Sequence, residues 1–133
     1  MKKKLSIPEN ISVLVIEDSQ TMADQLLNAL KKLGFPDSIT HTLDCKTTYE
    51  ALNSKKFHLI ISDWNLPDGT GFEILTKVKG GGAHASAPFL MVTTENEVSN
   101  MIDAISAGAT EYLVKPWNID ELESKLAFCL EKI

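Results

Sequence analysis

The sequence feature that most constrains the fold is a regular alternation of β-branched apolar runs with amphipathic helical patterns. Strands are expected at 11–16, 37–43, 57–62, 89–94 and 111–115, and helices at 19–34, 46–54, 70–79, 96–107 and from 118 onward. Strands that alternate with helices form βαβ units, in which the strands are parallel and the helices cover both faces of the sheet. The sequence therefore predicts an α/β fold, a doubly wound (βα)5 three-layer sandwich around a parallel five-stranded sheet.

Local signals mark where several of these helices begin and end. Ser19 is the expected N-cap of the first helix and Gly34 its stop, while Asn118 and Glu121 have the spacing of a capping box at the last helix. In the helix at 96–107, apolar side chains recur at helical spacing: Val98, Met101, Ile102 and Ile105.

Length and composition predict one water-soluble domain. The chain has 133 residues, 44% of them hydrophobic and 23% charged, with a net charge of −5, which disfavours direct binding of nucleic acid. The longest apolar run, 126–130, is too short to span a membrane. We expect residues 1–10 to be a flexible N-terminal lead-in and residues 11–133 to form the domain. Cys45 and Cys129 are expected to be reduced thiols of a cytoplasmic protein.

Polar side chains follow four of the expected strands at their carboxyl ends. They are Glu17 and Asp18 after the first strand, Asp63 after the third, Thr93 and Thr94 on the fourth, and Lys115 on the fifth. Ligands of open parallel sheets bind beyond these ends, so we expect the side chains to converge. Neighbouring carboxylates raise one another's pKa unless a cation lies between them. Oxygen ligands of this kind suit Mg²⁺ together with a phosphate oxygen.

The position of Asp63 at the end of the most hydrophobic strand predicts a nucleophile. A metal ion and a lysine stabilise the charge of a phosphoryl group in transfer, so the site favours phosphoryl transfer to the Asp63 carboxylate. The turn at 65–69 lets the chain leave the strand, which would free a backbone carbonyl, that of Asn65, for the metal.

Four stretches carry a resemblance to a known family. They are VIED at 15–18, IISDWNLP at 60–67, LMVTTE at 90–95 and AGATEYLVKPW at 107–117. With these pieces in this order, the sequence resembles the CheY-like receiver domains of two-component response regulators over essentially all of the chain after residue 10. The resemblance implies a flavodoxin-like sheet with strand order 2-1-3-4-5.

The resemblance implies a role for each acidic residue of the site. Asp63 would accept a phosphoryl group from a sensor histidine kinase or a histidine phosphotransfer protein. Glu17 and Asp18, together with Asp63 and the carbonyl of Asn65, would hold Mg²⁺. The chain would catalyse at most its own phosphorylation and dephosphorylation.

The remaining site residues would form the switch. Thr93, with Thr94 as the alternative, would be drawn toward the phosphoryl group, and Tyr112 would turn inward with it. Lys115 would pair with the phosphoryl group, and its bond to Pro116 would be cis.

Phosphorylation would change the surface formed by the helix at 96–107, the strand at 111–115 and the last helix. This surface would bind a downstream protein target or, in a phosphorylation-dependent dimer, a second copy of the chain. No output domain is expected after Ile133; alternatively, the chain is the receiver module of a larger response regulator. Asn65 and Glu95 occupy the two variable positions that tune phosphate lifetime in the family, and this pair indicates a short-lived signal.

The sequence departs from the family pattern at two places. Thr70 stands where an aspartate more often precedes the glycine at Gly71, which puts the rigidity of this turn in question. Thr48 and Tyr49 lie at the start of the second helix, where small or apolar residues are commoner, so the packing of that helix is expected to differ.

Two other functions fit the residues less well. A phosphatase with an aspartyl-phosphate intermediate usually has a second aspartate two residues after the nucleophile, where this chain has Asn65. A flavin-binding module would need a phosphate loop rich in Ser and Thr, whereas the acids in EDSQT at 17–21 would repel the flavin phosphate. The histidines have no ligand spacing and are interpreted as bystanders: His41, His58 and His84.

Overall fold

The computed structural model describes residues 5–133; residues 1–4, the start of the expected lead-in, lie outside the described residues. Its main strands are β1 (Val13–Ile16), β2 (Thr40–Thr42), β3 (Leu59–Ser62), β6 (Phe89–Thr93) and β7 (Glu111–Val114). Its helices are α1 (Gln20–Lys32), α2 (Cys45–Ser54), α3 (Gly71–Lys79), α4 (Val98–Ser106) and α5 (Ile119–Leu130). A short hairpin of β4 (Asn65–Leu66) and β5 (Gly69–Thr70) completes the described elements.

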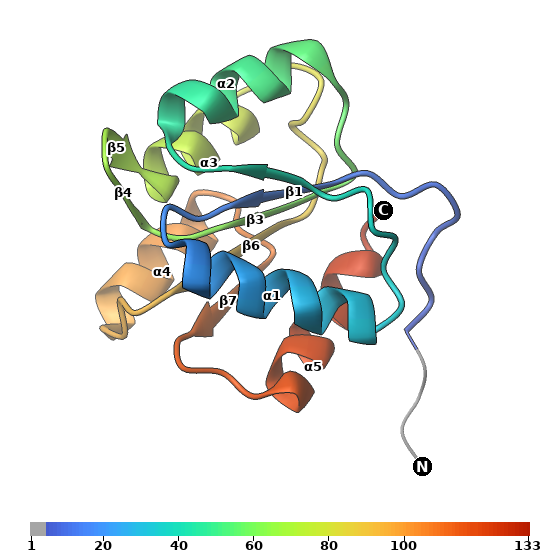
Figure 1. The fold of residues 1–133 in the computed structure, drawn as a ribbon. Helices are drawn as coiled ribbons and strands as arrows, with labels where there is room; N and C mark the ends of the chain where they lie inside the picture. Colours follow the sequence, from blue (N-terminus) through green and yellow to red (C-terminus); the bar gives the residue numbers. More distant parts are fainter. Residues whose placement is uncertain (1–4) are drawn as a thin grey trace.

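The five main strands form one parallel sheet in the order β2-β1-β3-β6-β7. When only these strands are counted, the order is 2-1-3-4-5, and helices cover both faces of the sheet (Figure 1). The predicted fold class is confirmed. Within the described range, none of the helices is long and apolar enough to cross a membrane. The hairpin was not predicted, because a two-residue strand leaves no periodic pattern in the sequence.

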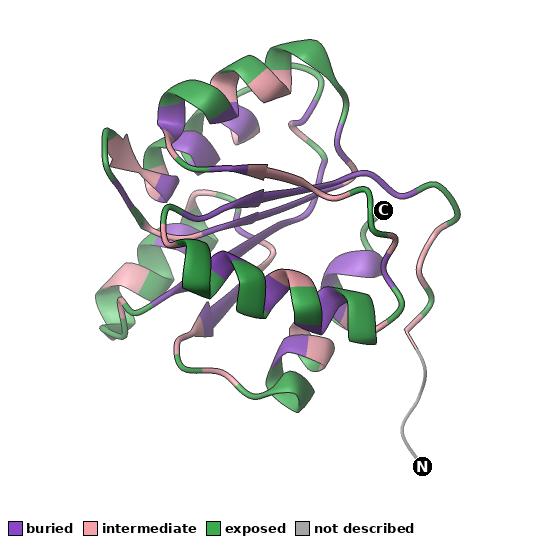
Figure 2. Cartoon of the chain, in the orientation of Figure 1, coloured by how far each residue is buried: buried purple, intermediate pink, exposed green. Residues whose placement is uncertain are grey.

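The sheet separates two hydrophobic cores, because alternate residues of each strand point to opposite faces. Val13 and Val15 of β1 pack with α1 and α5, whereas Leu14 and Ile16 pack with α2, α3 and α4. Every residue of β1, β3 and β6 is buried, as the central strands of Figure 2 show. Their continuous apolar runs therefore reflect burial on both faces.

The predicted helix ends are present. The Ser19 hydroxyl accepts a hydrogen bond from the Met22 N–H, which caps α1, and Gly34 has a φ of 105° just beyond the helix. Asn118 and Glu121 make the reciprocal bonds of a capping box at α5. Some boundaries differ: β2 covers only Thr40–Thr42 of the expected 37–43, and α4 begins at Val98 rather than near 96, since its N-cap Glu97 has extended backbone.

The two departures from the family pattern are accommodated by hydrogen bonds. The Thr70 hydroxyl accepts the N–H of Glu73 at 3.0 Å, so it caps α3 and fixes the turn. Thr48 is fully buried, but its hydroxyl donates to the Asp44 carbonyl oxygen and shares a hydrogen bond with the Thr42 hydroxyl, each at 2.7 Å. Threonine at these positions therefore leaves no buried polar group unsatisfied.

Two histidines hold the amino ends of the central strands. His58 Nδ1 accepts the N–H of Ser12 at 2.9 Å, and His84 Nε2 accepts the N–H of Phe57 at 3.0 Å. Burial and the charge of Lys56 lower the pKa of His84. Their interpretation as bystanders was wrong for the fold, because each imidazole satisfies a backbone donor that precedes a strand.

The bond to His84 predicts a loss of stability in acid. The pKa of His84 in the folded chain lies below its ordinary value of 6.5, so the unfolded chain binds more protons below that pH and folding weakens as the pH falls. An orphaned buried N–H costs about 1–2 kcal/mol. Urea denaturation at pH values above and below 6.5 should show that acid lowers the free energy of unfolding more for the parent than for His84→Gln. The glutamine amide oxygen can accept the same N–H without titrating. Equal losses would contradict the prediction.

Candidate functional site

The candidate site lies at the carboxyl edge of the sheet, where backbone hydrogen bonds continue past the strand ends. The Asp63 N–H donates to a β1 carbonyl at 3.0 Å, the Glu17 N–H to a β2 carbonyl at 3.0 Å, and the Lys115 N–H to the Thr93 carbonyl at 2.8 Å. Each of these residues is therefore held by the sheet although it stands beyond its own strand. Rigid strand ends present the side chains to one another.

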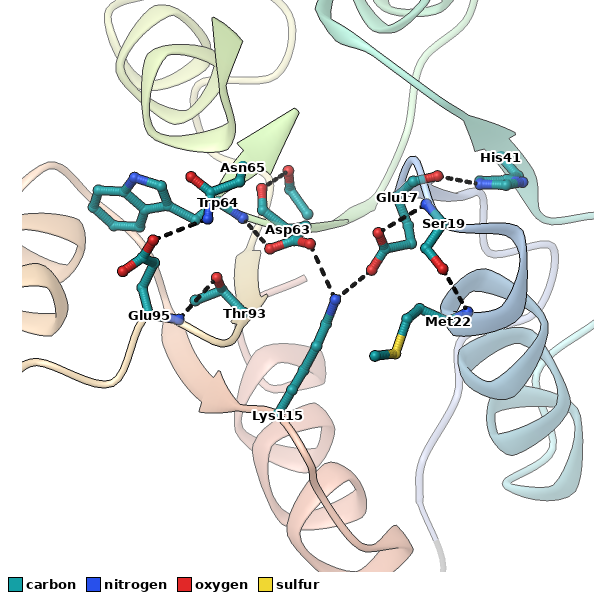
Figure 3. A network of polar contacts seen from close by, with 11 residues as sticks. Glu17, Ser19, Met22, His41, Asp63, Trp64, Asn65, Thr93, Glu95 and Lys115 are labelled. Carbon is teal, nitrogen blue, oxygen red and sulfur yellow. Dashed lines mark hydrogen bonds and ion pairs between the residues drawn. The ribbon is translucent and has the colours of Figure 1, made fainter. Parts of the chain in front are cut away.

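Lys115 joins the two carboxylates at the centre of the site (Figure 3). Its Nζ donates to Glu17 Oε1 and, at 3.0 Å, to Asp63 Oδ2. The second oxygens are also bound: Glu17 Oε2 accepts the N–H of Ser19 at 3.2 Å and Asp63 Oδ1 accepts the N–H of Trp64 at 2.6 Å. The three charged side chains are at most 13% exposed. The peptide bond after Lys115 is cis, as predicted.

Burial and hydrogen bonding shift the pKa values of Glu17 and Lys115. Burial raises the pKa of Glu17, and its hydrogen bond to Lys115 only partly opposes this. Burial by itself lowers the pKa of Lys115, but the hydrogen bonds to Glu17 and Asp63 outweigh it and leave the pKa raised. The Lys115 ammonium therefore remains charged and opposes the effect of burial on the pKa of Glu17.

Asp18 adds a third carboxylate to the site, which therefore carries more negative than positive charge. Glu17, Asp18 and Asp63 each offer an oxygen, and these oxygens lie within 4.8 Å of one another. Asp18 is exposed, so the cluster is open to solvent on its side. One ammonium cannot neutralise three carboxylates. The oxygen-only donor set and its open side fit a hydrated divalent cation such as Mg²⁺.

Thr93 and Tyr112 both contact the backbone of Glu95. Thr93 is fully buried, and its Oγ1 accepts the Glu95 N–H at 3.2 Å, whereas Thr94 is exposed. The Tyr112 ring lies inward, 4% exposed, and its hydroxyl donates to the Glu95 carbonyl at 2.6 Å. Burial raises the pKa of Tyr112 to about 12, so this hydroxyl remains a donor at neutral pH.

Figure 3 shows Glu95 on the side of Asp63 away from Glu17. Glu95 Oε1 accepts the side-chain amide of Asn65 at 2.9 Å, and its Oε2 lies 3.5 Å from the amide nitrogen of Asn100 in α4. The sequence singled out Asn65 and Glu95 as variable positions but did not predict that they bond. Such a bond between side chains 30 positions apart has no local signal in the sequence.

Two supporting residues were missed. A Cβ at Gly71 would lie 1.9 Å from the Asp63 carbonyl oxygen and 2.8 Å from the Ser62 hydroxyl, so only glycine allows this close approach. His41, which was interpreted as a bystander, places Nε2 2.8 Å from the Glu17 carbonyl oxygen. Gly71, which follows the turn at 65–69, could have been predicted as a position of close backbone approach. Nothing in the sequence around His41 indicates its contact with Glu17.

Comparisons with known proteins agree with this geometry. The profile of a family described as the response regulator receiver domain matches residues 13–127. Chemotaxis protein CheY1 of Helicobacter pylori is 32% identical over 122 residues, which cover 90% of this chain and 97% of that protein. Chemotaxis protein CheY of Pseudomonas aeruginosa is 32% identical over 123 residues, which cover 92% of this chain and 98% of that protein. The solved structure of chemotaxis response regulator CheY4 of Vibrio cholerae gives a TM-score of 0.78 at 30% identity, and the match covers 87% of this chain and 95% of that chain.

The buried ammonium makes a testable contribution to stability. Without added metal at neutral pH, Lys115→Met should lower the free energy of unfolding by about 2–4 kcal/mol, because it leaves two largely buried carboxylates unpaired. The loss should shrink in acid, where Glu17, whose pKa is raised, takes up a proton. Added Mg²⁺ should restore part of it by replacing the lost charge.

Urea denaturation with and without Mg²⁺ measures both effects. Lys31→Met is the matched control, because the Lys31 side chain is 70% exposed in a surface ion pair. Its loss should change the free energy of unfolding little. Equal stabilities of Lys115→Met and the parent would contradict the prediction.

Proposed function

This chain belongs to the family of response regulator receiver domains, and we propose that it is a signalling switch that accepts a phosphoryl group on Asp63. The observation that carries the proposal is the Lys115 ammonium between Glu17 and Asp63, with Asp18 in the same cluster. Positive charge preorganised around a carboxylate nucleophile is what phosphoryl transfer requires. The chain would act only on its own phosphorylation and dephosphorylation.

The phosphoryl donor would be a phosphohistidine of a sensor histidine kinase or of a histidine phosphotransfer protein. A carboxylate oxygen of Asp63 attacks the phosphorus, the bond from phosphorus to the histidine nitrogen breaks, and that nitrogen keeps the electron pair and takes up a proton. The Trp64 N–H and the Lys115 ammonium hold the two Asp63 oxygens in a fixed orientation. This orientation lowers the entropic cost of the transfer.

Mg²⁺ would be held by the carboxylates of Glu17, Asp18 and Asp63 and by the backbone carbonyl of Asn65. When bound, the ion supplies positive charge to the oxygens of the phosphoryl group. Glu17 is oriented for this role, since its two oxygens are fixed by Lys115 and by the N–H of Ser19. The exposed Asp18 would be reached first by an ion that enters from solvent.

Thr93 and Tyr112 would form the switch. The Thr93 hydroxyl accepts from the Glu95 N–H, and its own proton can be donated to an oxygen of a phosphoryl group on Asp63. The Tyr112 hydroxyl binds the carbonyl of the same residue, Glu95. Phosphorylation would therefore favour one conformation of the segment around Glu95 and, with it, the inward position of Tyr112.

The output surface would be formed by α4, β7 and α5. Within Val98–Ser106, Ala104 alone is buried. The apolar stripe of α4 is exposed instead: Val98 67%, Met101 39%, Ile102 57% and Ile105 45%. An uncovered apolar helix face is typical of a protein-binding site. We propose that a downstream protein target binds there, with a second copy of the chain as the alternative in a phosphorylation-dependent dimer.

We also propose a cytoplasmic protein that does not bind nucleic acid directly. The net charge of −5 opposes attraction to phosphate backbones. Within residues 5–133, Cys45 and Cys129 are both buried and free, which is typical of a reducing compartment.

Incubation with acetyl phosphate and Mg²⁺ tests the proposed function directly. Intact mass should show one added phosphoryl group on the parent, none on Asp63→Asn, and none when a chelator removes the metal. Asp24→Asn, a change of an exposed acid in α1, serves as the matched control and should be phosphorylated like the parent. A parent that gains no mass under any condition would overturn the proposal.

The bond between Asn65 and Glu95 leads to a prediction about the lifetime of the phosphorylated form. Both side chains are polar, and Figure 3 shows them together beside Asp63, so water should reach the phosphorus and the phosphoryl group should be lost well within hours. Asn65→Met, which places a bulky apolar group there, should extend the lifetime about tenfold, equivalent to ~1.4 kcal/mol of barrier.

The mass decay after removal of acetyl phosphate measures this lifetime. The control is Asn53→Met, since Asn53 is exposed in α2. A parent that keeps its phosphoryl group for many hours at neutral pH would contradict the prediction.

A further inference from the structure

The side chain of Asp68 binds the hairpin of β4 and β5 to the first turn of α2. Asp68 lies at the hairpin turn; its Oδ1 accepts the N–H of Cys45 at 2.7 Å and its Oδ2 accepts the N–H of Lys46 at 3.1 Å. These donors are among the N–H groups that no partner inside the helix can satisfy. The hydrogen bond to Cys45 lowers the pKa of Asp68, which keeps the carboxylate charged.

The second cap is not required by α2 itself. Asp44 is already its N-cap, and its Oδ1 accepts the N–H of Thr47 at 2.8 Å and the Thr47 hydroxyl at 2.6 Å. An ordinary helix begins with one such residue. Asp68 comes from a segment 23 positions further along the chain than Cys45, so its bonds join two elements rather than complete one.

The hairpin is also packed closely against Cys45 of α2 and Glu73 of α3, and the Cys45 thiol lies 3.9 Å from the Thr70 carbonyl oxygen as a donor. A Cβ at Gly69 would lie 3.0 Å from Cys45 Sγ and 3.3 Å from a Glu73 carboxylate oxygen. Cys45 is 7% exposed, and burial raises its pKa to about 11, so the thiol is neutral at this contact. The hairpin therefore has little room to shift while Asp68 stays bound.

The hairpin needs such an anchor because it is too short to be stable by itself. Only two residue pairs join its strands, Asn65 with Thr70 and Leu66 with Gly69, and isolated hairpins are marginal even when longer. Its start is bound by the side-chain hydrogen bond from Asn65 to Glu95. Its turn is bound by Asp68. The hairpin is therefore attached at its start to Glu95, which follows β6, and at its turn to α2.

From this geometry we propose that Asp68 is a positioning residue of the phosphorylation site. By fixing the hairpin on α2, it holds Asn65 beside Asp63, so that the backbone of Asn65 is in place for Mg²⁺ before the ion arrives. This inference rests on the proposed function. It adds to that function a tie between α2 and the site, through a side chain that contacts neither the ion nor the phosphoryl group.

Magnesium affinity of Asp68 variants tests the inference. Asp68→Ala should raise the Kd for Mg²⁺, measured by calorimetric titration, about threefold to tenfold. Loss of a residue that hydrogen-bonds a metal ligand directly typically lowers metal affinity about 10–100-fold. The effect of Asp68 should be smaller, because Asp68 does not bond a metal ligand directly. Asp68→Asn retains one acceptor oxygen and should give an intermediate Kd. Exchange of the Cys45 and Lys46 amide protons should be faster in Asp68→Ala than in the parent.

The matched control is Asp44→Ala, which removes the other carboxylate cap of α2 and leaves the hairpin attached. Its Kd for Mg²⁺ should equal that of the parent, with urea denaturation confirming that every variant is folded. If Asp44→Ala weakens Mg²⁺ as much as Asp68→Ala, the effect comes from helix stability and the inference fails.

An unchanged Kd in Asp68→Ala also overturns the inference, while binding by the parent leaves the proposed function intact. A parent that binds no Mg²⁺ overturns both. If Asp68→Ala does not fold, Asp68→Asn decides the question alone.

Discussion

The ammonium of Lys115, held between Glu17 and Asp63, is the interaction on which the rest of the structure depends. Lys115 lies 98 positions after Glu17 and 52 positions after Asp63 in the sequence. The contact is stable only because the sheet brings the ends of β1, β3 and β7 to one edge. Burying these charges costs free energy that a loosely held pair would not recover. The backbone bonds that continue past the strand ends keep the three side chains in register, so fold and site are one arrangement.

This dependence explains how much of the molecule could be predicted from sequence. The alternation of strands and helices fixes a parallel sheet, and the rule that ligands gather at the carboxyl ends of its strands places Glu17, Asp63 and Lys115 together without further knowledge. What the sequence could not reveal depends on contacts between distant segments. The bond from Asn65 to Glu95 and the attachment of Asp68 to α2 belong to this class, since nothing near either residue in sequence indicates its partner.

Helical periodicity has a related limit, which α4 makes clear. The spacing of Val98, Met101, Ile102 and Ile105 correctly predicts a helix with an apolar stripe, yet this stripe is exposed while Ala104 packs on the sheet. Periodicity reports that a face is apolar, and only the tertiary structure tells whether anything covers it. This exposed stripe is the reason why α4 is part of the proposed output surface. In α1, by contrast, Leu26 and Leu30 are buried and belong to the core.

The way α4 begins suggests why it, rather than another helix, would respond to phosphorylation. In the part of the chain that the structure describes, its N-cap Glu97 makes no side-chain hydrogen bond to the helix, while α1, α2, α3 and α5 are each capped by a side chain. The contacts that hold the start of α4 pass through Glu95, whose backbone binds Thr93 and Tyr112. An element with few buried contacts and a weak start opens at low cost. A change in the bonding of Thr93 would therefore be expressed first in α4, next to the apolar face that a partner would bind.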